Sequence, residues 1–196
     1  MICTLKGKGV MKMKECFISV DIETTGPVPG LYSLYELGAC VIGDENLQFR
    51  TDLRLLPLAR HTNEALSAVG IDDIHILEGW GITSTTKAVV SFSRWVRKVA
   101  LKSKPVFVAN NAPFDWMFVA YYFAWEGVEN PFGYSALDMK AYFMGMTGCS
   151  WKDATLKHMA EYANVPFGGL PHRALNDAII QGKIFAALLH SQRKQP

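Results

Sequence analysis

One eight-residue segment constrains the fold of this chain more than any other. Residues 16–23 read CFISVDIE, and alternate residues of a β-strand point to opposite faces of its sheet. One face carries only apolar side chains: Ile18, Val20 and Ile22. The other face ends in two acids, Asp21 and Glu23. A wholly apolar face indicates a strand that packs against a core. We therefore predict a buried strand whose two acidic side chains leave the sheet on the same side.

The rest of the chain predicts one α/β domain built around a mixed sheet. Residues 36–42 and 47–56 read as two strands joined by a hairpin turn at 43–46, so the sheet begins as an antiparallel meander. Two short later strands, at 105–109 and 134–137, alternate with helices and are expected to be parallel. Helices are expected at 62–68, from Thr85 or Thr86 onward with Val89, Phe92, Val96 and Val99 as the buried stripe, from Pro113 to Trp125, at 155–162 and at 173–190. We expect a flexible N-terminal extension at 1–14 and a single domain at 15–196.

Composition excludes several classes of protein. The chain has 196 residues, of which 49% are hydrophobic and 19% charged, so it is globular and long enough for a substantial core. Its formal net charge of +2 is too small to indicate a partner. The four cysteines are widely spaced, which argues against a zinc site or a disulfide framework and suggests a reducing compartment. The longest apolar run is far shorter than the ~20 residues of a membrane span. We therefore expect a soluble cytoplasmic protein without a membrane partner.

The two acids at the end of the first strand suggest a cation site. Adjacent carboxylates on one face, at Asp21 and Glu23, repel each other unless a cation lies between them. Mg²⁺ and Mn²⁺ prefer oxygen ligands and would relieve that repulsion. The alternative is a solvent-exposed strand end with two acids that have no function, because an Asp-x-Glu pair is common.

Three more residues have both a structural and a catalytic interpretation. Asp115 lies in the first turn of its helix, where the backbone dipole alone favours an acid. His172 follows a loop rich in glycine and proline, and Asp177 lies about one and a half turns into the last helix. Each residue taken singly is a weak signal of function.

Taken together, the motifs are specific. The chain contains DIETTG at a strand end, NNAPFD at the start of an aromatic helix and HRALND at the start of the last helix. In this order and setting they resemble the motifs of the DEDDh exonucleases, the superfamily that includes ribonuclease T and the proofreading subunits of bacterial DNA polymerases. The resemblance extends roughly from Cys16 to His190. Two positions stand out: Asn110 lies where relatives often have histidine, and Asp138, at the end of a strand, is interpreted as structural.

The resemblance implies a ribonuclease-H-like fold and a metal-dependent 3′→5′ exonuclease that releases nucleoside 5′-monophosphates. It implies two divalent ions, Mg²⁺ or Mn²⁺, held by four acids: Asp21, Glu23, Asp115 and Asp177. Asp21 would bridge both ions, and their role would be to neutralise the scissile phosphate and activate a water molecule. Imidazole titrates near neutral pH, so His172 would accept the proton of that water.

The same resemblance suggests how the substrate is bound. The turn formed by Thr24, Thr25 and Gly26 would hold the terminal sugar through backbone groups, and residues 64–71 would wall the terminal base. Phe114 is a candidate for base stacking, and Asn111 fits the second motif. The expected partner is nucleic acid with a free 3′ end, single-stranded, with DNA and RNA both open; a homodimer and association with a polymerase are also open. Two alternatives are an inactive exonuclease fold used as a binding module, and a ribonuclease restricted to short oligonucleotides. The presence of all four acids and the histidine argues against the first.

Overall fold

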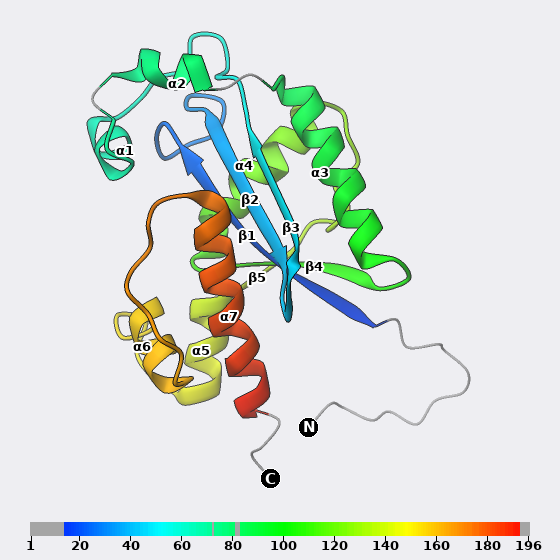
Figure 1. The fold of residues 1–196 in the computed structure, drawn as a ribbon, viewed down its shortest axis with the longest axis vertical. Coiled ribbons are helices and arrows are strands. Elements are labelled where there is room, and N and C mark those ends of the chain that lie inside the picture. Colours follow the sequence, from blue (N-terminus) through cyan, green and yellow to red (C-terminus); the bar gives the residue numbers. More distant parts are fainter. Residues whose placement is uncertain (1–13, 72, 81–82, 193–196) are drawn as a thin grey trace.

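A computed structural model of the chain describes residues 14–71, 73–80 and 83–192 (Figure 1). The predicted N-terminal extension therefore lies outside the described residues, apart from Lys14. The strands are β1 (Glu15–Thr24), β2 (Leu34–Val41), β3 (Asp44–Asp52), β4 (Lys104–Ala109) and β5 (Ala136–Asp138). They form one sheet in the order β3-β2-β1-β4-β5. β1 pairs antiparallel with β2 and parallel with β4, so the predicted mixed α/β sheet is confirmed.

The predicted hairpin turn at 43–46 is wrong. β2 ends at Val41 and β3 begins at Asp44, so only Ile42 and Gly43 form the turn. Gly43 has φ 92°, a left-handed conformation that glycine adopts without strain. The polar residues 44–46 resemble a loop by composition, but they belong to a strand at the exposed edge of the sheet. An edge strand tolerates polar side chains because much of it faces water.

The helices agree with the predictions at five places and add two elements. They are α1 (Asn63–Ala68), α2 (Ile74–Trp80), α3 (Thr85–Ala100), α4 (Ala112–Trp125), α5 (Met139–Thr147), α6 (Leu156–Tyr162) and α7 (Ala174–Gln192). Helices α2 and α5 were not predicted. The cap of α3 is Ser84, whose side chain accepts a hydrogen bond from the backbone of Lys87, and not Thr85 or Thr86. Within the described ranges, no helix has the length and apolarity needed to span a bilayer.

Asp138 has the structural role that the sequence suggested. One carboxylate oxygen accepts a 2.7 Å hydrogen bond from the backbone N–H of Ala141 and so caps α5. The other oxygen accepts a 2.7 Å hydrogen bond from the backbone N–H of Ala112 at the start of α4. Asp138 therefore joins the beginnings of two helices at the same end of the sheet.

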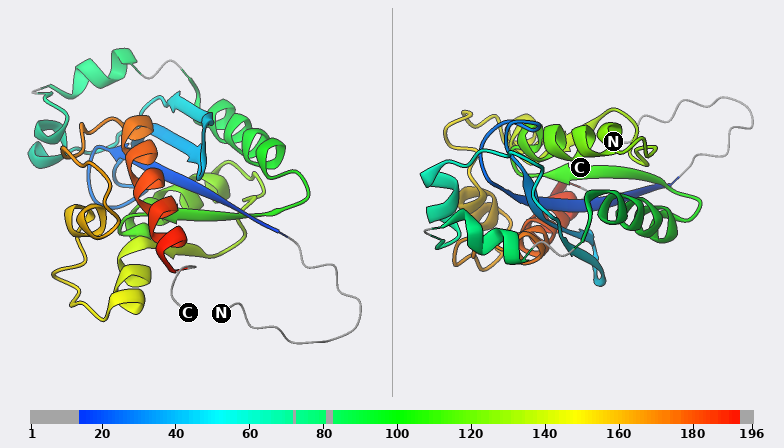
Figure 2. Two further views of the ribbon diagram at one scale, coloured as in Figure 1. Left: turned by 60° about the horizontal axis from the view of Figure 1, so that its bottom comes forward. Right: turned by 90° about the horizontal axis from the view of Figure 1, so that it is seen from above.

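The two faces of the sheet carry different helices. Helices α3 and α4 cover one face, where their apolar side chains form a single core with Ile18, Val20 and Ile22 of β1. Helix α7 packs across β1 and β2 on the opposite face, with α5 and α6 beside its C-terminal half (Figures 1 and 2). Pairing between β1 and β4 ends at Ser19 and Val108. Beyond that point β1 continues to Thr24, while the chain after β4 turns into α4.

Candidate active site

The candidate site lies where β1 extends beyond its pairing with β4. Asp21 and Glu23 come after the last β1–β4 pair, so no strand residue covers them on that side. Asp115 lies in the first turn of α4 and is only 5% exposed. Its charge, with that of Glu23, contributes to the raised pKa of Asp21, so the three carboxylates interact electrostatically. Helix α4 therefore brings a third acid to the end of the strand.

Helix α7 approaches the same point from the opposite face because β2 has a glycine there. Gly38 is paired directly with Asp21 in the sheet. A β-carbon at Gly38 would lie 2.2 Å from backbone atoms of Ala174 and Leu175, so any larger residue would push the start of α7 off the sheet. Because glycine allows this contact, the helix begins directly beside Asp21. Asp177 follows in its first turn, and His172 precedes it.

These elements bring together side chains that are far apart in the sequence. Oxygen or nitrogen atoms of Glu23, His172 and Asp177 all lie within 4.8 Å of one another. Asp177 is 1% exposed, and one of its carboxylate oxygens is buried without a hydrogen-bond partner among the described residues. A buried oxygen without a donor costs free energy that a cation would recover. The donors are carboxylates and one imidazole, which suits a small divalent ion such as Mg²⁺ or Mn²⁺. The residues present therefore fit such an ion.

The carboxylates raise one another's pKa values. Burial, and then the charges of Asp115, Glu23 and Asp177, raise the pKa of Asp21 well above its usual range. Burial and the charges of Asp177 and Glu36 raise the pKa of Glu23 to about 8, against the lowering effect of Arg173. Burial also raises the pKa of Asp115 and of Asp177. The crowding of these buried carboxylates therefore favours proton binding at the site, and a divalent cation would oppose it.

Gln181 is a member of the site that the sequence did not suggest. Its amide nitrogen donates a 2.5 Å hydrogen bond to a carboxylate oxygen of Asp21. Its amide oxygen accepts a 2.8 Å hydrogen bond from the backbone N–H of Asn110, just after β4. Gln181 thus fixes the orientation of the Asp21 carboxylate. The available signal was its position four residues after Asp177, which places both side chains on one face of α7.

A cavity of ≈490 Å³ adjoins the acidic cluster. Its wall is formed by residues of β1, the turn after it, α1 and α4: Ile22, Glu23, Thr24, Gly26, Pro27, Thr62, Glu64, Ala65, Ala68 and Phe114. Glu23 belongs both to this wall and to the cluster with His172 and Asp177. The cavity and the cluster are therefore two parts of one site.

Of the residues predicted to bind substrate, Thr24, Gly26 and Phe114 line this cavity, whereas Thr25 and Asn111 do not. Thr25 is fully buried, and its hydroxyl donates to the carbonyl of Arg60 at 2.7 Å and accepts from the backbone N–H of Ser33 at 2.8 Å. It thereby ties the turn to the segment before α1. Asn111 is exposed at the start of α4 with φ 62°.

Comparison with known proteins agrees with this geometry. The family model of the 3′-5′ exoribonuclease Rv2179c-like domain matches residues 60–189. The 3′-5′ DNA exonuclease Cap18 of Escherichia coli is 35% identical over 178 residues, which cover 88% of this chain and 90% of that protein.

Two solved structures share the fold. The nuclease domain of 3′hExo, a DEDDh family member bound to rAMP, has a TM-score of 0.71 at 14% identity, with 93% of this chain and 95% of that chain covered. A 3′-exonuclease studied for its recognition of the histone mRNA stem-loop has a TM-score of 0.68 at 13% identity, with 90% of this chain covered. The present chain spans only 63% of that one. The predicted ribonuclease-H-like fold is confirmed, and the chain belongs to the family of the 3′-5′ exoribonuclease Rv2179c-like domain.

Proposed function

We propose that this protein hydrolyses the last phosphodiester at the 3′ end of single-stranded nucleic acid and releases nucleoside 5′-monophosphates. One observation carries the proposal: Glu23 is shared between the cluster of cation-ligating side chains and the wall of the adjoining cavity. A terminal nucleotide in the cavity would place its phosphate beside the cluster. Hydrolysis at that phosphate removes one nucleotide at a time.

The four acids are proposed to hold two Mg²⁺ or Mn²⁺ ions. The charges of the other three acids all act on Asp21, which would hold the ions together with Glu23, Asp115 and Asp177. Such ions neutralise the phosphate and make water acidic enough to be deprotonated near neutral pH. Gln181 keeps the Asp21 carboxylate in one orientation.

His172 is proposed as the general base. Its side chain is exposed, and its ring lies within 4.8 Å of donor atoms of Glu23 and Asp177. It would accept the proton of the attacking water as the new oxygen–phosphorus bond forms. The bond from phosphorus to the 3′-oxygen of the preceding nucleotide breaks, and that oxygen is protonated to a 3′-hydroxyl. The shortened strand is then a substrate for the next cycle.

The cavity is proposed to select a terminal nucleotide. Phe114 is half-buried in its wall and offers a ring face to the base. Thr24 and Gly26 line the same cavity from the turn after β1, where the sugar would lie. Residues 64–68 of α1 close the opposite side. Thr25 acts by holding the turn, and we assign Asn111 no contact with the terminal nucleotide.

The test is a side-by-side digestion of 3′-labelled single-stranded DNA and RNA, duplexes with recessed or overhanging ends, a dinucleotide and a circular single-stranded DNA. The matched family is named for an exoribonuclease and the relative from E. coli for a DNA exonuclease, so both polymers are needed. We expect stepwise loss of nucleoside 5′-monophosphates from linear strands and none from the circle. Rapid cutting of the circle would indicate an endonuclease, and activity on the dinucleotide alone would indicate a ribonuclease of short oligonucleotides.

A further inference from the structure

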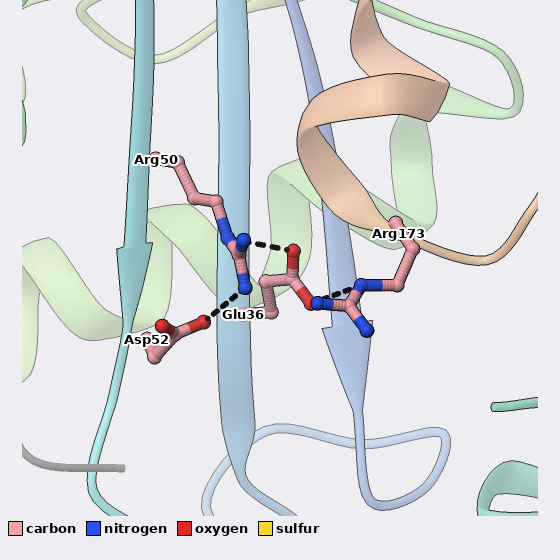
Figure 3. A network of polar contacts seen from close by, with 4 residues as sticks. All are labelled: Glu36, Arg50, Asp52 and Arg173. Atoms are coloured by element: carbon pink, nitrogen blue, oxygen red, sulfur yellow. Dashed lines mark hydrogen bonds and ion pairs between the residues drawn. The ribbon is translucent and has the colours of Figure 1, made fainter. Parts of the chain in front are cut away.

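A further buried acid lies next to the site and has no role in the proposed reaction. Glu36 of β2 is 3% exposed and is paired directly opposite Glu23 of β1. Like charges directly opposite on neighbouring strands destabilise a sheet. A buried carboxylate at this position therefore requires nearby cations, and Figure 3 shows the Glu36 carboxylate between two guanidinium groups.

The two guanidinium groups come from different parts of the fold. Arg50 belongs to β3; its Nε lies 3.1 Å from one Glu36 oxygen, and its Nη2 lies 3.1 Å from Asp52 on the same strand. Arg173 stands between His172 and the first residue of α7, and its Nε lies 3.7 Å from the other Glu36 oxygen. The Arg50 pair therefore connects two neighbouring strands. The Arg173 pair connects the sheet to the beginning of the helix that carries Asp177.

The start of α7 needs such a connection. His172 has φ 54°, a left-handed backbone conformation that is strained for a residue with a side chain and persists only where its surroundings hold it. Gly38, two residues after Glu36, contacts the backbone of Ala174 and Leu175. This contact sets how close the helix lies to the sheet, but a glycine offers no polar group to fix its rotation. The Glu36–Arg173 pair supplies a directional contact one residue after His172.

We propose that Glu36 and Arg173 form a positioning pair that fixes the start of α7 on β2, and thereby holds His172 and Asp177 against Glu23. Neither residue needs to touch the substrate. The inference rests on the proposed function because it treats the cluster as the cation site. Groups that orient metal ligands typically change metal affinity or activity by about 10–100-fold when they are removed.

The network itself supplies a matched control. Arg50→Gln and Arg173→Gln each remove one guanidinium from the same buried carboxylate, so both should lower thermal stability. Only Arg173→Gln should weaken Mn²⁺ binding by about 10–100-fold, measured by titrating the melting temperature with Mn²⁺ in the absence of substrate. It should also lower kcat more than it changes KM. Glu36→Gln should resemble Arg173→Gln, and the double variant should be no worse than the more severe single one because the two residues act together.

Equal Mn²⁺ affinities in the two arginine variants, whether both unchanged or both weakened, would overturn the proposal and leave a purely structural network. An Arg173→Gln variant with normal Mn²⁺ affinity and only a raised KM would also overturn it, because it would make Arg173 a substrate contact. If Arg173→Gln does not fold, Arg173→Lys is informative, since a lysine that keeps the ion pair should bind Mn²⁺ nearly as well as wild type. The Mn²⁺ titration needs no turnover and therefore tests the positioning pair separately from the proposed function. A wild-type protein that is inactive on labelled strands would contradict the proposed function, but the Mn²⁺ affinities of the variants would still decide the role of Glu36 and Arg173.

Discussion

The two faces of β1 show how one strand serves both folding and chemistry. Ile18, Val20 and Ile22 face the core under α3 and α4 and are at most 5% exposed. Asp21 and Glu23 face α7 and have raised pKa values because of burial and repulsion from neighbouring acids. Burial of a large aliphatic side chain stabilises a fold by about 1.5–3 kcal/mol, whereas crowding of acids opposes folding.

The comparison shows that the acidic face lowers the stability of the fold. Burial of the apolar face offsets that loss. Because alternate side chains point in opposite directions, each face can be altered separately. Substitutions on the acid face should therefore change activity without unfolding the protein, and substitutions on the apolar face should do the opposite.

The largest effect is expected for Asp21→Asn. This change removes a carboxylate from the centre of the cluster, while the amide oxygen can still accept the hydrogen bond from Gln181. Essentially all nuclease activity in Mg²⁺ or Mn²⁺ should be lost, while the circular dichroism spectrum and melting temperature of the metal-free protein are retained or improved. Retention of more than about a tenth of wild-type turnover would contradict the assignment of Asp21 as a metal ligand.

His172→Ala should lower kcat by about 10²–10⁴-fold, the usual range for loss of a general base. The exposed imidazole contributes little to the core, so the urea midpoint should change little. The acid limb of the pH–rate profile should disappear, measured on 3′-labelled strands at saturating Mn²⁺. An unchanged acid limb would mean that another group accepts the proton.

Ile18→Ala tests the apolar face. Ile18 is fully buried, and its truncation should lower the free energy of unfolding by about 2–5 kcal/mol, measured by urea denaturation. The kcat of the folded fraction should stay at the wild-type value, because the side chain points away from the acids. A lower kcat in buffer without urea, at a temperature where the variant is fully folded, would show that the two faces are coupled.

The smallest effect concerns the pH dependence of stability. Folded-state pKa values above the ordinary carboxyl range, including Glu23 at about 8 instead of 4.5, mean that the folded protein binds more protons than the unfolded chain. Stability in EDTA should therefore fall as pH rises from about 4.5 to about 8. A divalent ion that binds only the folded state adds about 2.7 kcal/mol at a hundredfold excess over Kd, so Mn²⁺ at pH 8 should raise the melting temperature by about 5–10 °C.

Glu23→Gln is the control for this measurement. The variant lacks one of the raised carboxyl groups, so its melting temperature in EDTA should depend less on pH, and Mn²⁺ should stabilise it less. A wild-type melt that responds neither to pH in this window nor to Mn²⁺ would show that these acids do not form a cation site.

The sequence by itself determined the elements whose signals are local. The alternation in residues 16–23 predicted β1, and Thr62 and Thr155 cap the two short helices that were expected after them. The three motifs predicted the superfamily and five side chains, and the structure brings these to one end of the sheet. Each of these inferences depends on the order of residues along a single element or on a motif of consecutive residues.

Only the tertiary structure decided how the elements meet. The register of β1 against β2 places Gly38 beside Asp21 and Glu36 opposite Glu23, and no local pattern encodes that register. The packing of α7 against β2 brings Arg173, more than a hundred residues later in the chain, to the Glu36 carboxylate. Strand pairing and the placement of helices on the sheet are set by contacts between distant segments. The free energy of these contacts depends on the packing of the whole sheet. The residues that hold the site together were therefore hidden in the sequence, whereas those expected to carry its chemistry were not.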